Sequence, residues 1–394
     1  MRILVLSFYY SPDLSAGSFR TTALVKALQE KDSEDIHIDV VTTLPNRYKT
    51  FSAEAPEYEQ SDGLETFRIK LPPHQSGMRD QSRAFIQFFK HANALVSERE
   101  YDLVYATSSR LMTAVLGTWI ARRKKALLYL DIRDIFVDTI NDILSKKVTF
   151  FVKPVFSFIE KWTFNKADNI NLVSEGFREY FESRYPNQSV SFFTNGVDDE
   201  FIEAGSNLIK KDTAIAPIKV LYAGNMGEGQ GLHTIIPLLA KNLQNKVRFI
   251  LIGDGGRKYK LQTSLTKSGC NNVEVREPVH RKELIDAYID ADVLFIHLND
   301  YAAFRKVLPS KIFEYAALGK PIWAGVSGYA AEFIKKEIDN AVVFHPGNVN
   351  EAINVFDSLN IIDKQRPIFV SKFARKNIMS LMADDLLSIL QKRN

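Results

Sequence analysis

The chain contains one cysteine, Cys270, in 394 residues, so it has no intramolecular disulfide and fits a reducing compartment. It also lacks any run of about 18 consecutive apolar residues, the length that a membrane-spanning helix needs. Near the N-terminus the only apolar run is Ile3–Leu6, which is too short for the core of a signal peptide. We therefore expect a cytoplasmic protein whose contact with the inner membrane is at most peripheral.

The chain also has little net charge and no pattern of metal ligands. A formal net charge of +4 is too small to indicate nucleic-acid binding. The seven histidines show no H-E-x-x-H or comparable spacing. Asp290-Ala291-Asp292 has the form of a D-x-D metal motif, but the end of a helix and the start of a strand explain it better. We expect neither a metal nor another cofactor.

Apolar runs typical of strands alternate with helical patterns along the whole chain, which indicates parallel sheets covered by helices. Hydrophobic residues make up 45% and charged residues 25%, as in globular proteins, and the length favours two domains. Expected strands of the first half are 3–7, 36–42, 67–71, 103–106, 127–131, 169–173 and 190–194, and expected helices are 18–29, 83–98, 111–124 and 176–183. Expected strands of the second half are 219–223, 247–253, 273–275, 293–298, 321–324 and 341–344, before a long helix over 368–390.

Between the halves, residues 199–217 have the Gly, Ser, Lys, Asp and Pro content of a linker. The expected domains are 1–205 and 206–366, followed by a C-terminal helix in 367–394. Each half is predicted to be a doubly wound, Rossmann-like sheet, and such sheets bind ligands at the carboxyl ends of their strands. The sequence therefore predicts an α/β protein with two Rossmann-like domains that face a ligand-binding cleft.

The most informative segment is 307–323, which reads VLPSKIFEYAALGKPIW. Pro309 and Ser310 are typical of a helix start, Pro through its fixed φ and Ser through a hydroxyl that caps free N–H groups. Lys311 lies at that start, where free N–H groups favour an anion, and Glu314 lies one turn further along. A cation suits a phosphate, and a carboxylate suits the two hydroxyls of a ribose. The Lys-x-x-Glu spacing alone fits a capped surface helix equally well.

The whole string resembles the donor-site signature P-S-K-x-x-E-Y, followed by G-x-P, of retaining glycosyltransferases of family 4. It is similar to the branch of this family that builds bacterial surface polysaccharides such as capsule and O-antigen. The more widespread signature of the family carries an additional glutamate at the position of Lys306, so the role of that glutamate does not transfer to this chain. The resemblance covers nearly the whole chain. It implies the two-domain GT-B fold, with the final helix crossing back onto the first domain.

A second segment with a donor-binding pattern is the glycine-rich loop 224–231, GNMGEGQG, which follows an expected strand and precedes a helix. Its glycines let the backbone approach a ligand and offer N–H groups to an anion, whereas a flexible turn is the alternative. By resemblance this loop lies along the diphosphate of the donor. Most relatives carry an Arg and a Lys where this chain has Asn225 and Gln230. The resemblance then implies a weaker clamp, or one rebuilt from Lys311 and Arg305.

The turn 253–256, GDGG, also follows an expected strand. It fails the dinucleotide-binding fingerprint at Lys258, where a glycine is needed. By resemblance the turn lies beside the donor nucleotide. The donor-binding residues expected from these segments are Gly224, Asn225, Gly227, Gln230, Gly253, Arg305, Leu308, Pro309, Ser310, Lys311 and Glu314.

Two places in the first half are expected to face the cleft. In the loop 11–20, Gly17 brings N–H groups to the cleft and Arg20 faces an anionic acceptor or the donor phosphates, with a tight turn and a solvated Arg as an equal alternative. Arg133 and Asp134 end an expected strand. By resemblance they face the transferred sugar or the acceptor hydroxyl, and a salt bridge between them is the alternative.

Residues 146–166 mix lysines with phenylalanines and a tryptophan. This composition suggests an amphipathic helix lying on anionic lipid of the inner leaflet. Arg122–Lys125 adds positive charge nearby in the sequence. A core-packing helix with a lysine-rich outer face explains the pattern equally well.

The resemblance implies transfer of a hexosyl or N-acetylhexosaminyl group, with retention, from a nucleotide sugar to a glycan or polyprenyl-diphosphate-linked acceptor. UDP is the favoured nucleotide. Lys311 is expected to stabilise the leaving diphosphate, and Arg133 and Asp134 complete the expected catalytic set. Two hypotheses stay open beside this one. A non-hydrolysing UDP-sugar 2-epimerase needs carboxylates or histidines at a sugar C–H, and no such cluster is visible. A membrane-docked scaffold with a decayed donor site is the other.

Overall fold

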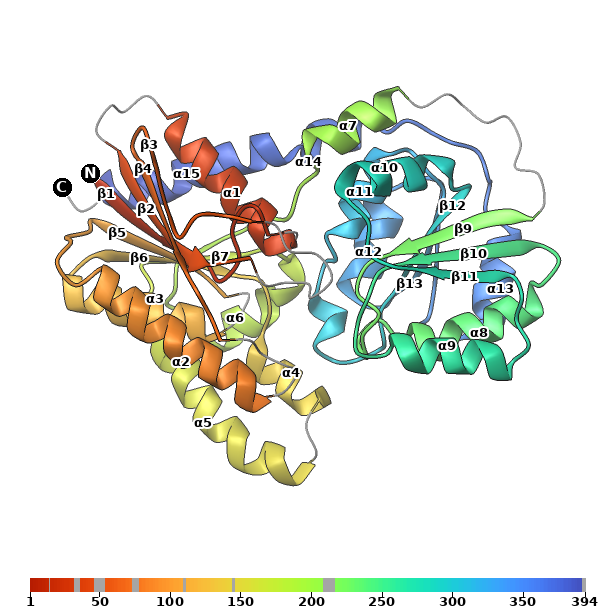
Figure 1. Cartoon of the computed structure of the whole chain (residues 1–394), viewed down its shortest axis with the longest axis horizontal. Helices are drawn as coiled ribbons and strands as arrows, with labels where there is room; N and C mark the ends of the chain where they lie inside the picture. Colours follow the sequence, from red (N-terminus) through yellow and green to blue (C-terminus); the bar gives the residue numbers. More distant parts are fainter. Residues whose placement is uncertain are drawn as a thin grey trace. The chain divides into compact units, whose positions relative to one another are not determined.

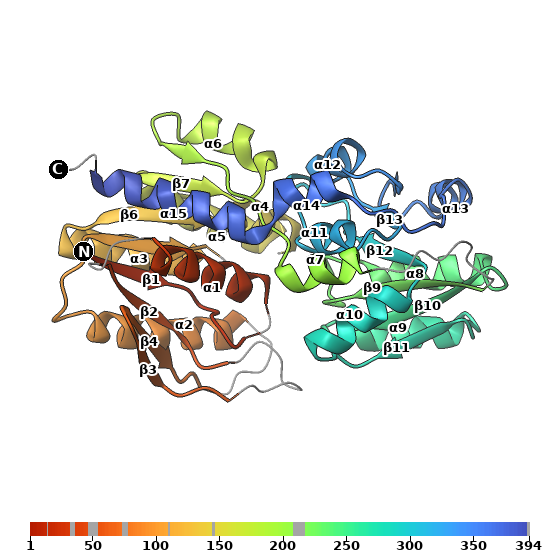
Figure 2. The same cartoon turned by 90° about the horizontal axis from the view of Figure 1, so that it is seen from above.

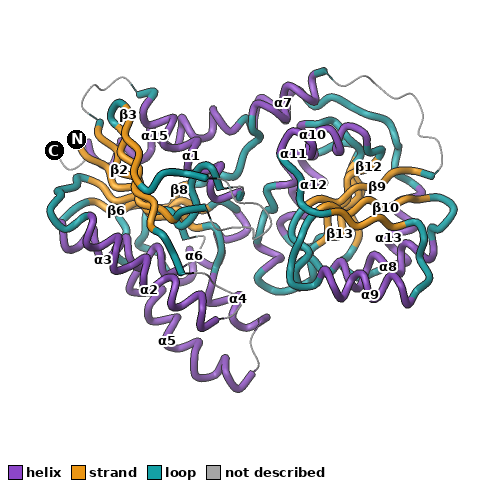
Figure 3. Tube along the Cα trace, viewed as in Figure 1, coloured by secondary structure: helices purple, strands orange, loops and turns teal. Residues whose placement is uncertain are grey.

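The computed structural model describes residues 1–13, 15–31, 36–45, 54–72, 78–108, 111–143, 146–207 and 217–391. Residue contacts divide the chain into two compact units, Met1–Thr194 with Lys376–Asn394, and Asn195–Arg375 (Figure 1). The sequence interpretation places these boundaries after residues 205 and 366, so the structure moves the first one earlier and the second one later. Each unit has its own sheet with helices on both faces (Figure 3).

The first unit contains an eight-stranded sheet in the order β3-β4-β2-β1-β5-β6-β7-β8. Its strands are β1 (Arg2–Leu6), β2 (His37–Thr43), β3 (Tyr58–Ser61), β4 (Leu64–Ile69), β5 (Leu103–Thr107), β6 (Leu127–Ile132), β7 (Asn169–Leu172) and β8 (Val190–Ser191). All neighbouring strands are parallel except β3 and β4, which form an antiparallel hairpin. The helices are α1 (Ala16–Gln29), α2 (Met78–Leu95), α3 (Leu111–Lys124), α4 (Phe136–Ile143), α5 (Lys146–Phe164), the 3₁₀ turn η1 (Glu175–Phe177), α6 (Arg178–Arg184) and α15 (Arg375–Gln391).

Helices cover both faces of this sheet, with α1 and α15 on one face and α2, α3 and α5 on the other (Figures 1 and 2). The central strand β1 is therefore buried from both sides, and its residues Ile3–Leu6 are fully buried. A strand covered on both faces needs such a continuous apolar run, which is why the sequence identified it. The hairpin strand β3 has only exposed side chains, YEQS, so no apolar pattern indicated it.

The second unit contains a fully parallel six-stranded sheet in the order β11-β10-β9-β12-β13-β14. Its strands are β9 (Ile218–Ala223), β10 (Val247–Ile252), β11 (Val273–Arg276), β12 (Val293–His297), β13 (Ile322–Gly325) and β14 (Ala341–Phe344). Its helices are α7 (Asp199–Ser206), α8 (Leu232–Asn242), α9 (Lys258–Lys267), α10 (Arg281–Asp290), the 3₁₀ turn η2 (Phe304–Lys306), α11 (Lys311–Ala317), α12 (Tyr329–Glu337), α13 (Val349–Asp357) and α14 (Pro367–Phe373). Trp323 is fully buried in the core of this unit, with its ring against Phe249, Phe295 and Phe356.

The predicted linker is wrong in its first part, because residues Asp199–Ser206 form the helix α7. Residues 208–216 of the predicted linker lie outside the described residues. The helix packs closely on α11, since a Cβ added to Gly205 would stand 2.1 Å from the backbone oxygen of Ala317. This packing places α7 in the second unit and moves the boundary toward the N-terminus.

The single long helix predicted over 368–390 is also wrong, because the chain breaks at Ala374 into α14 and α15. Ala374 is extended (φ −57°, ψ 123°) and forms a parallel bridge with Val197. The Val197 N–H donates to the oxygen of Phe373, and the Arg375 N–H donates to the oxygen of Val197, both at 2.8 Å. These two bonds use backbone groups that a continuous helix would have kept for itself.

After the break, α15 packs on the first unit. The Lys31 ammonium pairs with Asp384 at 2.6 Å, and the Tyr129 hydroxyl donates to Asp385 at 2.8 Å. Among the helices that the structure describes, none combines the length and the apolar character that crossing a bilayer requires.

We predict that Gly205→Ala destabilises the protein, because the added methyl group overlaps the carbonyl of Ala317. Overpacking of this kind costs about 1–3 kcal/mol. The better helix propensity of alanine offsets at most about 1 kcal/mol of it. The measurement is the free energy of unfolding in urea.

Gly256→Ala is the matched control, because a Cβ at Gly256 would meet no heavy atom within 4 Å. It should change the free energy of unfolding by less than about 0.5 kcal/mol. A Gly205→Ala variant as stable as the parent would show that α7 is not packed on α11 as described.

Candidate functional site

The side chain of Lys311 lies against the first glycine of the loop 224–231. A Cβ added to Gly224 would stand 2.5 Å from Cε of Lys311 and 3.4 Å from its Nζ. Gly224 also has φ 149°, a conformation that other residues rarely adopt. The lysine can therefore lie along this backbone only because residue 224 has no side chain.

Gly253 lies beside Gly224 because β9 and β10 pair in parallel, with Ala223 opposite Ile252. A Cβ at Gly253 would stand 1.9 Å from the carbonyl oxygen of Gly224, and its φ is 146°. Three expected donor-binding residues, Gly224, Gly253 and Lys311, are thus brought together at the carboxyl ends of two parallel strands. This is the edge at which such sheets bind ligands.

Lys311 and Glu314 are both half-buried, and a fully buried tyrosine of α10 lies between them. The Lys311 ammonium donates to the Tyr288 hydroxyl at 3.4 Å, and that hydroxyl donates to Glu314 Oε2 at 3.5 Å. Burial lowers the pKa of Lys311, and the nearby Glu314 carboxylate offsets part of this effect. A bound anion would restore the stabilisation that the ammonium loses through burial. Sequence reasoning missed Tyr288, because nothing distinguishes it from other apolar-face residues of its helix.

The start of α11 differs from the prediction. Ser310 has helical angles (φ −59°, ψ −29°) and its hydroxyl caps no N–H group, so the predicted capping role is wrong. The N–H groups of Ile312 and Phe313 already donate to the carbonyls of Pro309 and Ser310. The helix has only seven residues. The positive charge at this place therefore comes mainly from the Lys311 ammonium rather than from a helix terminus.

The other expected residues before α11 are less available to a ligand. Arg305 forms two hydrogen bonds with the carboxylate of Asp300, at 2.8 and 2.5 Å. Asp300 also accepts from the Ser327 hydroxyl. Leu308 is buried and Pro309 is half-buried. Arg305 is thus already paired in this structure, which weakens the expectation that it clamps a phosphate.

Asn225 and Gln230, which occupy the positions of the Arg and Lys of relatives, bond to each other. Asn225 Nδ2 donates to Gln230 Oε1 at 2.9 Å, and the Gly227 N–H donates to the same oxygen at 3.2 Å. The loop is held by its own side chains, so the alternative of a flexible turn is not supported. Neither residue supplies a positive charge.

His297, at the end of β12, and Asn299 just after it bond to the glycine-rich loop 224–231. Sequence reasoning missed these contacts. His297 Nδ1 donates to the oxygen of Gln230 at 2.7 Å, and its Nε2 accepts the Gly347 N–H at 3.1 Å. Asn299 donates through its backbone N–H to Gly229 and through its amide to Glu228. One imidazole nitrogen donates and the other accepts, so His297 is neutral here. Burial lowers the pKa of His297 to about 4.

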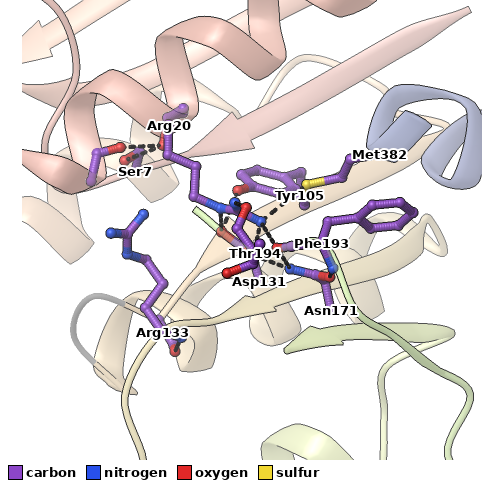
Figure 4. A network of polar contacts seen from close by, with 12 residues as sticks. Ser7, Arg20, Tyr105, Asp131, Arg133, Asn171, Phe193, Thr194 and Met382 are labelled. Carbon is purple, nitrogen blue, oxygen red and sulfur yellow. Dashed lines mark hydrogen bonds and ion pairs between the residues drawn. The ribbon is translucent and has the colours of Figure 1, made fainter. Parts of the chain in front are cut away.

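In the first unit, Arg20 is fully buried, which corrects the expectation that it faces an acceptor or the donor phosphates. Its guanidinium donates to both oxygens of Asp131, at 2.8 and 3.0 Å, and to the carbonyls of Phe193 and Thr194 (Figure 4). Burial of this pair is offset by the mutual attraction of its charges, which raises the pKa of Arg20 and lowers that of Asp131. Arg20 therefore ties α1 and β6 to the segment after β8.

Gly17 is likewise part of the packing of this unit. It is buried in the first turn of α1, where its carbonyl accepts from the Thr21 hydroxyl at 3.0 Å. A Cβ at this position would make only an ordinary contact, 3.7 Å from Ser15 Oγ. Nothing in the described residues requires a glycine here.

Arg133 follows β6 and differs from Arg20 in having no carboxylate of its own (Figure 4). Asp131 is already bonded by Arg20, by the Tyr105 hydroxyl at 2.9 Å and by the Asn171 amide at 2.7 Å. Nη1 of Arg133 is buried and has no hydrogen-bond partner among the described residues. Burial lowers the pKa of Arg133, and Asp131 offsets this only in part. An unpaired buried donor with a positive charge suits an anionic or hydroxyl-rich ligand.

Asp134, the second residue of this predicted pair, has an exposed side chain.

The D-x-D sequence of the second unit has a local role at the start of β9. Asp292 accepts the Lys219 N–H at 2.9 Å, and Asp290 pairs with the Lys219 ammonium at 3.0 Å. Within the described ranges, no three potential metal ligands gather.

Comparisons with known proteins agree with this geometry. Residues 17–196 match the family described as "Glycosyl transferase 4-like domain", and residues 206–372 match "Glycosyl transferases group 1". The chain is 23% identical over 337 residues to the "Putative colanic acid biosynthesis glycosyl transferase WcaI" of Escherichia coli (strain K12). That alignment covers 81% of this chain and 82% of the relative.

Two solved structures share the fold over nearly the whole chain. Sucrose-phosphate synthase from Thermosynechococcus elongatus aligns over 100% of both chains with a TM-score of 0.76 and 14% identity. Anabaena Alr3699/HepE in complex with UDP-glucose aligns over 98% of this chain and 100% of its own, with a TM-score of 0.69 and 17% identity.

The two Rossmann-like units and these neighbours define the fold as GT-B. The chain is a glycosyltransferase with a glycosyl transferase 4-like N-terminal domain and a glycosyl transferase group 1 C-terminal domain.

We predict that Arg20→Met lowers the free energy of unfolding by about 3–5 kcal/mol, because it leaves the Asp131 carboxylate buried without its main partner. The free energy is measured by urea unfolding. Arg20→Lys keeps the charge but loses the bidentate geometry, so it should fall between the parent and Arg20→Met.

Arg248→Met serves as the control, since its ion pair with Glu274 lies at the surface, with 53% and 38% of the two side chains exposed. This substitution should cost less than about 1 kcal/mol. An Arg20→Met variant that costs no more than the control would refute the structural role of Arg20.

We predict that His297 makes stability depend on pH between about 4 and 6.5. The pKa of His297 is about 4 in the folded chain, against an ordinary value of 6.5. As the pH falls through this window, only the unfolded chain takes up the proton, so stability decreases by up to about 3 kcal/mol. His297→Gln should remove this part of the slope, measured by urea unfolding at several pH values. Gly256→Ala provides the control, because it changes no titratable group and should keep the slope of the parent. Parallel curves for the parent and His297→Gln would contradict the prediction.

Proposed function

We propose that this glycosyltransferase transfers a hexosyl or N-acetylhexosaminyl group from a UDP-sugar, in the cytoplasm and with retention of the anomeric configuration. The proposed acceptor is a polyprenyl-diphosphate-linked or growing glycan of a bacterial surface polysaccharide such as capsule or O-antigen. The observation that carries the proposal is the half-buried Lys311 ammonium lying along Gly224, with Glu314 one turn away. Two similar proteins support the proposed acceptor and donor. The Escherichia coli relative is named for colanic acid biosynthesis, and the structural neighbour from Anabaena was solved with UDP-glucose.

Lys311 is proposed to neutralise the diphosphate. Negative charge builds up on the leaving diphosphate as the bond from the sugar breaks, so a fixed cation there stabilises the transition state more than the ground state. The backbone of Gly224 and Gly253 is free of side chains at this place, which lets phosphate oxygens approach. Because Lys311 supplies the positive charge, the proposal requires no metal ion.

Glu314 is proposed to hold the ribose, since a carboxylate accepts hydrogen bonds from two neighbouring hydroxyls. Tyr288 contacts both Lys311 and Glu314 and fixes their separation. The loop residues Asn225, Gly227 and Gln230 then line the phosphates with neutral groups.

For the transfer itself, the bond from the anomeric carbon to the phosphate oxygen breaks and a bond to the acceptor oxygen forms on the same face of the sugar. The acceptor proton passes to the oxygen of the leaving phosphate. Arg133 and Asp134 are proposed to face the transferred sugar or the acceptor. The unpaired Nη1 of Arg133 supports a role for this residue.

Calorimetric titration with UDP and with uridine tests the donor site. Lys311→Ala should weaken UDP binding by roughly 10–100-fold, as expected for a lost hydrogen bond to a charged group, and leave uridine binding nearly unchanged. Glu314→Gln should weaken both ligands, because both contain the ribose. Lys335→Ala, at an exposed position of α12, is the control and should bind like the parent.

Equal UDP affinity in Lys311→Ala and the parent would overturn the assignment of Lys311. If the parent protein binds GDP but not UDP, the assignment of UDP as the donor nucleotide is wrong. The anomeric configuration of the product, read by NMR, decides retention against inversion.

A further inference from the structure

Among the described residues, helix α5 packs on the first unit through one face. On that face Glu160 is buried and accepts hydrogen bonds from the hydroxyls of Tyr180, at 2.5 Å, and Tyr185, at 2.9 Å. Phe164, also buried, packs on Phe181 with ring centroids 5.3 Å apart. These contacts hold the helix in place, so its opposite face is presented as a rigid surface.

That opposite face carries large apolar side chains in contact with solvent. Phe150 and Phe151 are each 75% exposed and Phe158 is 73% exposed. Val148 and Val155, at 44% and 57%, extend the same stripe along the helix. Residues 151, 155 and 158 recur at the spacing of one helical face, and the rings of Phe150 and Phe151 touch, with centroids 5.3 Å apart. We call these five residues the α5 stripe.

An exposed stripe of this kind is unfavourable in water and usually marks a surface that another body covers. Figure 1 shows α5 at the outer side of the first unit, away from α1 and α15. Single exposed apolar residues occur elsewhere in the chain, such as Tyr259 and Ile368, but these two stand alone on different helices. Only a contiguous set needs a common explanation.

The charges around the α5 stripe indicate what covers it. Lys147 and Lys161 are exposed, and Lys166 is exposed just after the end of the helix. Lys147 comes four residues before Phe151 and Lys161 three residues after Phe158, so helical spacing places both lysines on the side of the stripe. The one acidic residue of α5 is Glu160, and its side chain is buried on the other face. A surface that combines phenylalanines with lysines and presents no carboxylate from its own helix complements anionic lipid headgroups above an acyl layer.

We propose that the α5 stripe docks this enzyme on an anionic lipid bilayer. The phenylalanines enter the boundary between headgroups and acyl chains, and the lysines contact the lipid phosphates. The contact is peripheral, because α5 keeps its buried face on the protein. No described helix is long and apolar enough to cross a membrane. This docking does not depend on the nucleotide or acceptor proposed above.

Sedimentation of the full chain with vesicles tests the proposal. Vesicles of phosphatidylethanolamine that contain roughly 30% anionic phosphatidylglycerol should bind the protein in about 50 mM salt through their negative surface potential, and binding should weaken as salt screens the lysines. Pure phosphatidylcholine vesicles should bind it at least about tenfold less. No binding of the parent protein to the anionic vesicles would overturn the proposal.

The triple variant Phe150→Ser, Phe151→Ser, Phe158→Ser should lose at least about tenfold in vesicle affinity. Its control is the triple variant Tyr259→Ser, Ile368→Ser, Leu381→Ser, which removes exposed apolar residues elsewhere and should bind like the parent. Replacing Lys147, Lys161 and Lys166 by Gln should cost about fivefold per lysine on anionic vesicles only. Lys241, Lys260 and Lys267, exposed in the second unit, provide the matched charge control.

Unfolding curves and UDP titration of each variant separate a docking defect from misfolding or a failed donor site. A Phe triple variant that binds vesicles like the parent would refute the stripe as the docking surface. If sedimentation shows a dimer of the parent that the Phe variant loses, while vesicles bind neither, a second copy covers the stripe and the lipid proposal is wrong.

Discussion

The candidate donor site of the second unit depends on two positions where no side chain is present. Gly224 and Gly253 end neighbouring parallel strands so closely that a Cβ on either would overlap backbone or the stem of Lys311. Their absence of side chains lets a lysine from α11 lie along the first turn of the loop. The rest of the second unit supports this approach: Tyr288 separates Lys311 from Glu314, and His297 holds the far end of the loop through Gln230.

In the first unit, Arg20 and Arg133 look alike in the sequence, but only Arg20 is bonded to the buried carboxylate of Asp131. Asp131 is buried and its oxygens are bonded by Arg20, Tyr105 and Asn171. Arg20 is thereby fixed as a structural residue (Figure 4). Arg133, two residues after Asp131, keeps a buried nitrogen without a partner and is the arginine suited to a ligand. A buried ion pair holds its geometry because breaking it leaves an uncompensated charge.

Much of the fold could be predicted, because strands covered on both faces need continuous apolar runs, as in Ile3–Leu6. The failures have a common cause. The hairpin strand β3 is exposed on both faces, α7 has the composition of a linker, and the break at Ala374 comes from backbone bonds to Val197. Each of these depends on a partner distant in the sequence, which a local pattern cannot contain.

By itself the sequence determined the α/β class, the two sheets and the segment around Lys311, since periodicity and a short motif are local properties. The tertiary structure alone decided which polar residues are already paired. It buries Arg20, pairs Arg305 with Asp300, joins Asn225 to Gln230, and turns Glu160 inward so that the exposed face of α5 lacks its one acid. The physical reason is that a charged side chain takes its role from the groups that desolvate or neutralise it, and only folding brings those groups together.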